Sequence, residues 1–320
     1  MLLDTMERRY RAATTGRVDD DGTIFYFSAA DFAGLRREAF SFPSSAGHTL
    51  CGNFYWYDRC KKDRLIVFDH GMGSGHRGYM IEIELLARRG FLVFAYDHTG
   101  CMESGGEGMG GLTQSLKDLN DALHALKAHE SYGGLPISVV GHSWGGFAAL
   151  NIAAYHPDVT HIVAMAGFVS LETALGMWFR GPLSYFGKRI YAKELAADPE
   201  FAAANAITAL ARSHAKMLIM HSEDDPMVSF EKNFQVLHKA LGKRSNITFL
   251  RLKGKRHNPN YTGDAVAYKD EFFKLYQKVK KNDELTTDDE KTAFLHMFDW
   301  HRMTRQDTRV WRMIYQTLES

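Results

Sequence analysis

The chain has 320 residues, of which 45% are hydrophobic, and a formal net charge of +1. This length suffices for one large α/β domain or two small ones with a sizeable core. Because the charge is near neutral and the basic residues are scattered, there is no electrostatic case for a nucleic-acid partner. The three cysteines, Cys51, Cys60 and Cys101, are too few and too irregularly spaced for a disulfide framework and fit a reducing compartment.

The sequence also argues against membrane insertion and against a bound cofactor. It offers no apolar run of signal-peptide or membrane-span length, so we expect a cytoplasmic protein with no stable membrane insertion. No His-x-x-x-His or Cys-x-x-Cys pair suggests a metal site. The glycine-rich turn 71–75 lacks a spaced third glycine and is not followed by Gly-Lys-Ser/Thr, so it does not predict nucleotide binding. We expect no metal, no other cofactor, and a monomer or homodimer.

Taken in chain order, the sequence first predicts a short helix over Met1 to Ala13, within an N-terminal extension of residues 1–35. Residues 36–58 then alternate between apolar and polar side chains, which predicts a hairpin of two amphipathic strands at a sheet edge. Helices are predicted at 78–89, where Gly90 provides a C-cap, and at 113–131, where leucines recur at helical spacing. Short apolar runs predict the central strands, at 65–68, 91–96, 136–140, 161–166, 216–220 and 247–252.

Strands that alternate with helices imply right-handed crossovers and therefore a mostly parallel sheet. The predicted fold is α/β, with antiparallel N-terminal strands, helices on both faces of the sheet and an inserted helical cap. Its core comprises residues 36–167 and 216–281, and the cap comprises residues 168–215. Residues 282–320 form a C-terminal helical extension, with a capping-box pattern at Thr287 and Glu290, that we expect to pack on the core.

The cap is predicted because almost fifty residues separate two strands that a single crossover helix could connect. Insertions of this length in compact α/β domains are usually functional or disordered, and the aromatic content argues against disorder. Most of these aromatic side chains pack the core of the insert itself under the simpler interpretation. We expect some of them to line a substrate pocket: Trp178, Phe179, Tyr185 and Phe186.

The most informative stretch is Gly141-His142-Ser143-Trp144-Gly145, which lies between an apolar strand and a run of small and apolar residues typical of a helix. In such a sharp turn the backbones come close together, so residues without a Cβ are needed beside a strained serine. The serine hydroxyl would then lie at a helix N-terminus, where backbone N–H groups favour developing negative charge. This context predicts that Ser143 is a nucleophile rather than an ordinary turn residue.

A serine nucleophile needs a histidine base, which a carboxylate orients, and both are expected after later strands. Asp225 follows the strand 216–220, and His257 follows the strand 247–252, in the order nucleophile, acid, histidine. Glu223 and Asp224 adjoin Asp225 and remain alternatives for the acid. Cys101 could serve as a thiol nucleophile, but a small buried residue is the better interpretation.

With these segments and the turns after two earlier strands, the chain resembles an α/β-hydrolase of the serine hydrolase type. It is most similar to the esterase, lipase and serine aminopeptidase-like branch, over roughly residues 38–280. The turns are His70-Gly71 and the Asp97 turn with Gly100 and Ser104. In the latter, Thr99 and Met102 occupy places where the family often has arginine and glycine, which leaves the subfamily open.

The resemblance implies roles for individual residues. Ser143 matches the nucleophile, Asp225 the acid and His257 the base, and the backbone N–H groups of Met72 and Trp144 match an oxyanion hole. The supporting residues are expected to shape the elbow and the oxyanion loop: His70, Gly71, Gly141, His142 and Gly145.

We therefore expect a serine hydrolase that cleaves a carboxylic ester with an apolar or aromatic acyl part through an acyl-enzyme on Ser143. One alternative is a serine aminopeptidase or amidase acting on short peptides. That activity would need an acidic group in the cap, for which Glu172, Glu194 and Asp198 are candidates. A second alternative is a hydrolase-like fold that serves only as a binding protein, which an intact set of three residues argues against.

Overall fold

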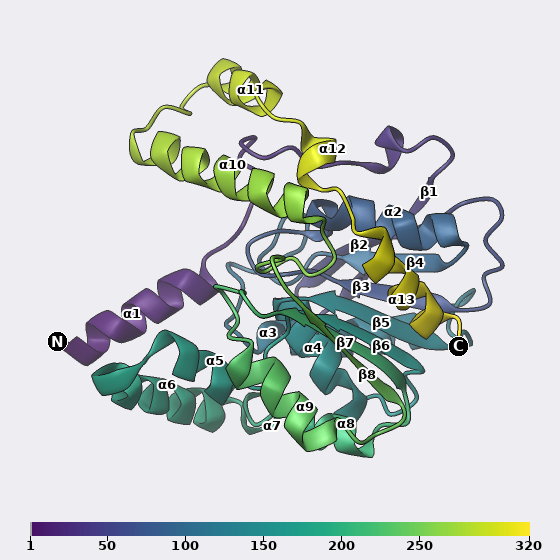
Figure 1. Ribbon diagram of the computed structural model, residues 1–320, viewed down its shortest axis with the longest axis horizontal. Coiled ribbons are helices and arrows are strands. Elements are labelled where there is room, and N and C mark those ends of the chain that lie inside the picture. Colours follow the sequence, from purple (N-terminus) through teal and green to yellow (C-terminus); the bar gives the residue numbers. More distant parts are fainter. Residues whose placement is uncertain (1) are drawn as a thin grey trace.

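The computed structural model describes residues 2–320, so Met1, the first residue of the predicted N-terminal helix, lies outside them. Its centre is an eight-stranded sheet with the order β1-β2-β4-β3-β5-β6-β7-β8 (Figure 1). The strands are β1 (Arg36–Pro43), β2 (Thr49–Trp56), β3 (Leu65–Asp69), β4 (Leu92–Tyr96), β5 (Ile137–His142), β6 (His161–Met165), β7 (Lys216–Ser222) and β8 (Ile247–Leu252).

The sheet has the predicted mixed topology. β1 pairs with β2 and β2 with β4 in antiparallel orientation, and all the other pairs are parallel. All residues of β3 to β6 are buried, as expected for central strands with helices on both faces. The predicted α/β fold class is therefore confirmed.

Helices cover both faces of the sheet, with α2 and α13 above it and α3, α4 and α8 below it in the view of Figure 1. Successive strand residues contribute to opposite faces, so Leu65 and Val67 pack in one core cluster and Ile66 and Phe68 in the other. The helices are α1 (Leu2–Thr15), α2 (Met80–Arg89), α3 (Gln114–Lys127), α4 (Trp144–Asn151), α5 (Leu171–Trp178), α6 (Ser184–Ala197), α7 (Pro199–Ala202), α8 (Ala206–Arg212), α9 (Val236–Leu241), α10 (Gly263–Lys281), α11 (Asp288–His296), α12 (Trp300–Met303) and α13 (Thr308–Leu318).

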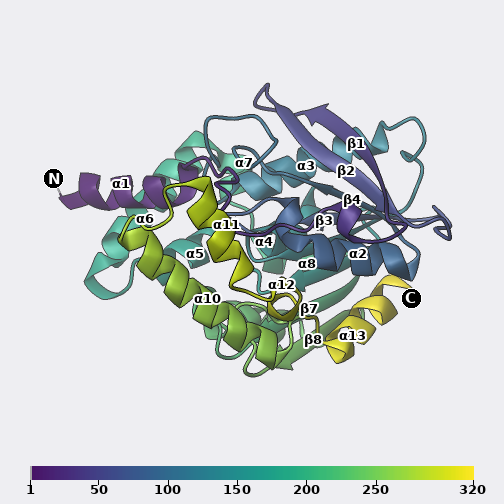
Figure 2. The same ribbon diagram turned by 90° about the horizontal axis from the view of Figure 1, so that it is seen from above.

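The helix that follows the last strand does not cover the sheet. Figures 1 and 2 both show α10 and α11 standing off the sheet, whereas α13 runs along it. α10 packs with α12, and its Phe272 lies in a separate small core with Phe294 and Met303. α13 contacts β6 and β7, so the end of the C-terminal extension completes the main core. Thr287 and Glu290 form the predicted capping box at the start of α11.

The packing of α13 can be tested at Ile314, a fully buried side chain in the core cluster it shares with α2. Truncation of a buried isoleucine removes apolar contacts and leaves a cavity, which typically costs about 2–5 kcal/mol. We expect Ile314→Ala to lower the free energy of unfolding by about 3 kcal/mol in urea titrations. Gln316→Ala, on the exposed face of the same helix, should change it by less than about 0.5 kcal/mol. Equal effects of the two variants would contradict this packing role.

The segment predicted as a cap forms α5 to α8 and lies on the side of the sheet opposite to α10. Its helices α5 and α6 pack together, and α6 contacts α1 (Figure 1). The ring of Trp178 packs edge-on against Tyr10 of α1, with centroids 6.0 Å apart, and Lys193 forms an ion pair with Glu7. The N-terminal helix therefore packs with the segment 168–215 as one unit.

Candidate active site

Ser143 lies in the sharp turn between β5 and α4, and its backbone is strained. Its φ of 56° and ψ of −108° are unusual for a residue with a side chain. A Cβ on Gly141 would lie 2.2 Å from the carbonyl oxygen of Gly145, and one on Gly145 would lie 2.2 Å from that of Asp69. The glycines on both sides of the serine are therefore required by close backbone approaches, which explains the pattern found in the sequence.

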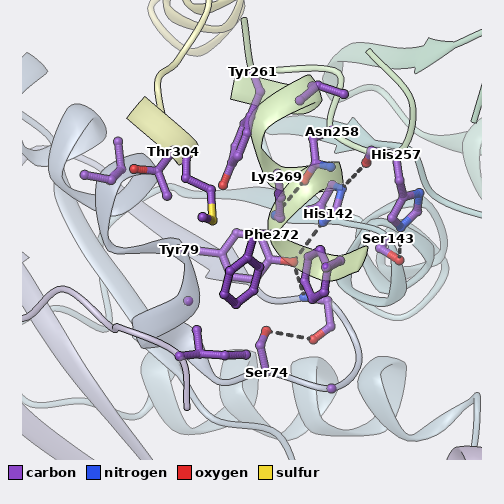
Figure 3. Close-up of a pocket in the computed structure, with 18 of the residues that line it drawn as sticks. Ser74, Tyr79, His142, Ser143, His257, Asn258, Tyr261, Lys269, Phe272 and Thr304 are labelled. Atoms are coloured by element: carbon purple, nitrogen blue, oxygen red, sulfur yellow. Dashed lines mark hydrogen bonds between the residues drawn. The ribbon is translucent and has the colours of Figure 1, made fainter. Parts of the chain in front are cut away.

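Ser143, His257 and Asp225 form one hydrogen-bonded chain. The Nε2 atom of His257 lies 2.8 Å from the Oγ atom of Ser143, and its Nδ1 atom lies 2.8 Å from the Oδ2 atom of Asp225. Figure 3 shows Ser143 and His257 facing one another at one side of a cavity. The three side chains come from the turn after β5, the loop after β7 and the loop after β8, all at the carboxyl ends of parallel strands.

The Asp225 carboxylate is fixed and stays ionised. Its Oδ1 atom accepts hydrogen bonds from the N–H groups of Met227 and Val228, at 2.8 and 3.0 Å. Its Oδ2 atom also lies 3.1 Å from the Nε2 atom of His221, and the side chain is fully buried. Burial alone would raise the pKa of Asp225, but the hydrogen bonds from His221 and His257 hold it well below its ordinary value.

The two neighbouring carboxylates have other partners. Asp224 is exposed, and its Oδ1 atom accepts hydrogen bonds from the Ser222 hydroxyl and from the N–H group of Gly254. Glu223 forms an ion pair with Arg251 on β8. Of the three candidates for the acid, Asp225 is therefore the one placed against His257.

Of the two residues predicted to form an oxyanion hole, Trp144 directly follows Ser143, and Met72 lines the same cavity as Ser143. Within the described part of the chain, the backbone N–H groups of Met72 and Trp144 donate no hydrogen bond to another protein group. The side chain of Trp144 points into the core, where its Nε1 atom donates to the carbonyl of Leu112 at 2.7 Å. The carbonyl of His70 accepts the N–H of Gly145 at 3.1 Å, which ties the loop after β3 to the elbow.

His142 and Tyr79 connect the loop after β3 to the loop that carries His257. The Tyr79 hydroxyl accepts the N–H of Gly71 at 3.1 Å and lies 2.8 Å from the Nδ1 atom of His142. The Nε2 atom of His142 lies 2.7 Å from the backbone carbonyl of His257, so it carries the proton. Burial first, with smaller contributions from the charges of His257 and Lys269, lowers the pKa of His142 to about 3. A neutral His142 therefore positions the backbone on both sides of Ser143.

His70 is likewise neutral and structural. It is fully buried, its Nδ1 atom donates to the carbonyl of Gly71 at 2.8 Å, and its Nε2 atom accepts the N–H of His98 at 3.0 Å. Burial is the largest of the effects that lower its pKa to about 3. His70 and His142 thus stay neutral near pH 7 and hold the turns beside Ser143 by hydrogen bonds.

Beneath the elbow lies a buried charged cluster that consists of His98, Asp69 and Asp118. His98 contacts both carboxylates, and its ring packs 4.9 Å from that of Trp144. Burial alone would lower the pKa of His98, but the two carboxylates raise it to about 10. Asp118 also accepts hydrogen bonds from the backbone and hydroxyl of Thr99 and from Gln114, so its pKa is lowered despite burial. His98 is therefore an imidazolium held against the charge of Asp118.

This cluster makes stability depend on pH in a defined direction. Since the pKa of His98 is raised on folding, its contribution is complete below its ordinary value of 6.5 and is lost as the pH rises through about 10. Asp118→Asn removes one partner of a buried ion pair and should lower the free energy of unfolding at pH 7 by about 3 kcal/mol. The fall between pH 7 and pH 10 should be smaller in this variant than in the wild type, as measured by urea titration.

The control for this prediction is Asp121→Asn. Asp121 lies on the outer face of the same helix, and its carboxylate accepts a hydrogen bond from the Ser45 N–H. This substitution should cost less than about 1.5 kcal/mol and leave the pH dependence as in the wild type. If Asp118→Asn and the wild type lost stability in parallel between pH 7 and pH 10, His98 would not be held as a cation.

A cavity of about 530 Å³ opens beside Ser143, on the α10 side of the sheet. Its walls come from the segment 24–27, the loop 71–74, the start of α2, the His257 loop, α10 and α12. The larger apolar side chains that line it are Ile24, Phe25, Tyr26, Phe27, Met72, Tyr79, Met80, Ile81, Met227, Val266, Phe272, Phe273 and Met303.

Here the structure differs from the predicted pocket lining. Trp178, Phe179, Tyr185 and Phe186 are not among the described residues that line this cavity. Phe179 is buried in the core, Trp178 packs on α1, and Tyr185 is exposed beside Phe186. The cavity is instead lined by residues of α10 and α12, whereas α13 packs on β6 and β7.

Three side chains of the site were missed at the level of sequence. Tyr79 directly precedes α2, Lys269 lies on α10, and His221 is the last residue but one of β7, four residues before Asp225. The spacing of His221 and Asp225 was the available signal, since such a turn can bring both side chains together. Tyr79 and Lys269 carried no local signal, because their roles depend on how distant segments pack.

In residues 2–320, no group of three His, Cys, Asp or Glu side chains is arranged to hold a metal ion. Among the same residues, no helix combines the length and apolarity needed to cross a bilayer.

Comparison with known proteins places this geometry in a family. The family model described as alpha/beta hydrolase fold matches residues 64–296. The chain belongs to the α/β-hydrolase family. Within this α/β hydrolase, the match includes Ser143, Asp225 and His257, whereas the segment 24–27 and α13 lie outside it.

Individual relatives are similar over shorter stretches. The chain is 35% identical to human monoglyceride lipase over 104 residues, which are 32% of this chain and 34% of that protein. It is 30% identical to a monoglyceride lipase homolog of monkeypox virus over 121 residues, which are 37% of this chain and 43% of that protein. The chain therefore matches less than half the length of these curated relatives.

Solved structures share the fold at low identity. An esterase of Pyrococcus furiosus aligns with a TM-score of 0.60 and 17% identity, covering 84% of this chain and 98% of the esterase. A putative dienelactone hydrolase of Klebsiella pneumoniae aligns with a TM-score of 0.52 and 14% identity, covering 73% of this chain and 90% of that one. These similarities establish the fold alone. The reaction must be argued from the chemistry of the site.

Proposed function

We propose that this α/β hydrolase cleaves carboxylic esters through an acyl-enzyme on Ser143. The observation that carries the proposal is the continuous hydrogen-bonded chain from Ser143 through His257 to the buried Asp225 carboxylate. His257 takes the hydroxyl proton as Ser143 attacks the ester carbonyl, and Asp225 holds the imidazole in the required tautomer. His257 then protonates the leaving alcohol, and a water molecule activated by the same histidine releases the acid.

We assign the stabilisation of the negative charge that develops on the carbonyl oxygen to the backbone N–H groups of Met72 and Trp144. Trp144 follows Ser143 and Met72 lines the same cavity, and both N–H groups are free of protein acceptors in the described residues, as donors reserved for a substrate should be. A donor fixed where the oxyanion develops is worth about 3–4 kcal/mol. The Trp144 N–H also lies at the start of α4, where the helix dipole favours negative charge.

The cavity supports a substrate with an apolar or aromatic part. Its volume is in the range of small-molecule sites, and most of its lining is apolar. The ester-cleaving activity in the names of the monoglyceride lipases and of the Pyrococcus esterase agrees with this assignment.

The charges around the cavity argue against aminopeptidase activity. Glu172 is exposed, and Asp198 forms an ion pair with Lys117. Glu194 lies near Tyr10 and Arg11 of α1. None of the three is among the described residues that line the cavity. An aminopeptidase must bind the ammonium group of its substrate, and the cavity offers more positive than negative charge for that purpose.

The test compares para-nitrophenyl esters of increasing acyl length with aminoacyl para-nitroanilides, using the full chain. We expect turnover of the esters and turnover of the anilides that is at least about a hundredfold slower, since the site lacks an ammonium-binding group. Exclusive turnover of the anilides would overturn the ester assignment. Absence of turnover together with failure of a fluorophosphonate probe to label the protein would overturn the catalytic assignment itself.

A further inference from the structure

The polar part of the cavity wall is positively charged. Four lining side chains carry a formal charge near neutral pH: Arg77, Arg256, Lys269 and Asp270. Three of them have a partner of opposite charge. The Arg256 Nε atom lies 2.9 Å from the Oδ2 atom of Asp270, and Arg77 lies 3.7 Å from Asp20. Within the described residues, Lys269 has no carboxylate within ion-pair distance.

Lys269 projects from α10 into the cavity with much of its hydrogen-bonding capacity unused. Its Nζ atom donates to the Oδ1 atom of Asn258 at 3.1 Å and lies 4.9 Å from the centre of the Tyr261 ring. Figure 3 shows it between Tyr261 and His142, with the bond to Asn258 drawn. An ammonium group has three N–H donors, and one hydrogen bond accounts for only one of them.

An ammonium group that is partly removed from water costs free energy unless acceptor groups replace the lost water. Its side chain is partly buried, and burial lowers its pKa even though Glu82 and Asp270 act in the opposite direction. A desolvated ammonium regains free energy when an anionic oxygen accepts its remaining donors. Glu82 does not fill this role within the described residues: its Oε1 atom accepts from Asn260 and Gln306, its buried Oε2 atom has no hydrogen-bond partner, and neither oxygen forms an ion pair with Lys269.

The position of Lys269 indicates which part of the substrate it would meet. Asn258, to which it is bonded, directly follows His257. His257 must face the leaving oxygen in order to protonate it, so the alcohol part of the ester lies on the histidine side of Ser143. Lys269 is thus placed beside the alcohol part.

We propose that Lys269 binds an anionic oxygen group, a carboxylate or a phosphate, on the alcohol part of the substrate ester. This inference rests on the proposed ester hydrolysis and defines its substrate class: amphipathic esters with an apolar acyl chain and a negatively charged alcohol. Lys269 is then a specificity-determining residue that contacts substrate, whereas Arg77 and Arg256 are already paired with Asp20 and Asp270.

The test uses two matched pairs of butyrate esters. The first pair is para-carboxyphenyl butyrate and its neutral carboxamide analogue, and the second is butyryl glycerol phosphate and butyryl glycerol. We expect the wild type to favour the charged member of at least one pair by about tenfold in kcat/KM, mainly through KM. The pair that shows the preference identifies the anion as a carboxylate or a phosphate. The preference should weaken as salt is added, because salt screens a partly exposed ion pair.

Variants separate recognition from a structural role. Lys269→Met should bring the charged-to-neutral ratio close to 1 while the neutral esters are still hydrolysed, and Lys269→Arg should retain most of the preference. Lys274→Met, which removes an exposed lysine of the same helix outside the cavity lining, should keep the wild-type ratio.

Two results would overturn the inference: a ratio near 1 for both pairs in the wild type, or a preference that Lys269→Met leaves intact. A Lys269→Met variant that slows charged and neutral esters equally would show a purely structural lysine, which also overturns it. Failure of the proposed function looks different, since the neutral esters would then not be hydrolysed by the wild type at all.

Discussion

Replacement of Ser143 by alanine is expected to lower kcat for ester hydrolysis by at least about 10⁴-fold. The variant keeps the backbone but removes the atom that forms the acyl bond, so only binding and the oxyanion donors remain to assist attack by water. Initial rates with para-nitrophenyl butyrate measure the loss. The fold should survive, because the Ser143 hydroxyl makes one hydrogen bond, to His257, and alanine bears the positive φ at similar cost.

Labelling by a fluorophosphonate probe provides the control for this result. The probe should modify the wild type and Ser41→Ala, which changes an exposed serine on β1, and should leave Ser143→Ala unmodified. Thermal unfolding curves for the three proteins should agree to within a few degrees. If folded Ser143→Ala retained esterase activity or labelling, another residue would be the nucleophile and the proposed mechanism would be wrong.

The sheet could be predicted from sequence because its signals are local. The apolar runs at 65–68 and 161–166 correspond to β3 and β6, and the alternation over 36–58 corresponds to the β1–β2 hairpin. Gly90 caps α2 in the left-handed conformation with a φ of 109°, as expected where the backbone turns away from a helix. Each of these features depends on a handful of consecutive residues.

The meeting of Ser143, Asp225 and His257 could also be predicted, since it follows from the topology. Once the strands are parallel and in order, the segments after β5, β7 and β8 must meet at one edge of the sheet, which brings Ser143, Asp225 and His257 together. The order of the strands thus determines proximity without knowledge of any side-chain contact. The choice between Asp224 and Asp225 needed the structure, because adjacent residues of a loop differ only in where the backbone points them.

The walls of the cavity could not be predicted, because they depend on which apolar segments of the chain pack against one another. The segment 168–215 and α10 both carry phenylalanine and tyrosine, so aromatic content alone does not show which of them lines the cavity. Trp178 meets Tyr10 of α1, a residue 168 positions away, whereas Phe272 and Phe25 line the cavity. It is α13 that packs on β6 and β7 while α10 packs with α12, and a periodic pattern does not encode this choice of partners.

The second large effect on kcat is expected at Asp225, the proposed acid of the site. Asp225→Asn is expected to lower kcat for ester hydrolysis by about 10⁴-fold, the loss typical when a carboxylate that orients a catalytic histidine becomes an amide. The amide oxygen would remain bonded to the N–H groups of Met227 and Val228, so the amide nitrogen would face His257. That nitrogen is a donor, and it would force the histidine to carry its proton on Nε2, where it cannot accept the proton of Ser143.

Asp224→Asn is the matched control, since it makes the same change one residue earlier in the same loop. Asp224 accepts hydrogen bonds from Ser222 and Gly254 and does not contact His257, so we expect kcat to fall by less than about tenfold. The two variants should therefore differ by about three orders of magnitude in kcat, with similar KM values in stopped-time assays at pH 7 to 8. A larger loss in Asp224→Asn than in Asp225→Asn would assign the acid to Asp224. Equal losses would mean that the loop conformation, rather than one carboxylate, supports the histidine.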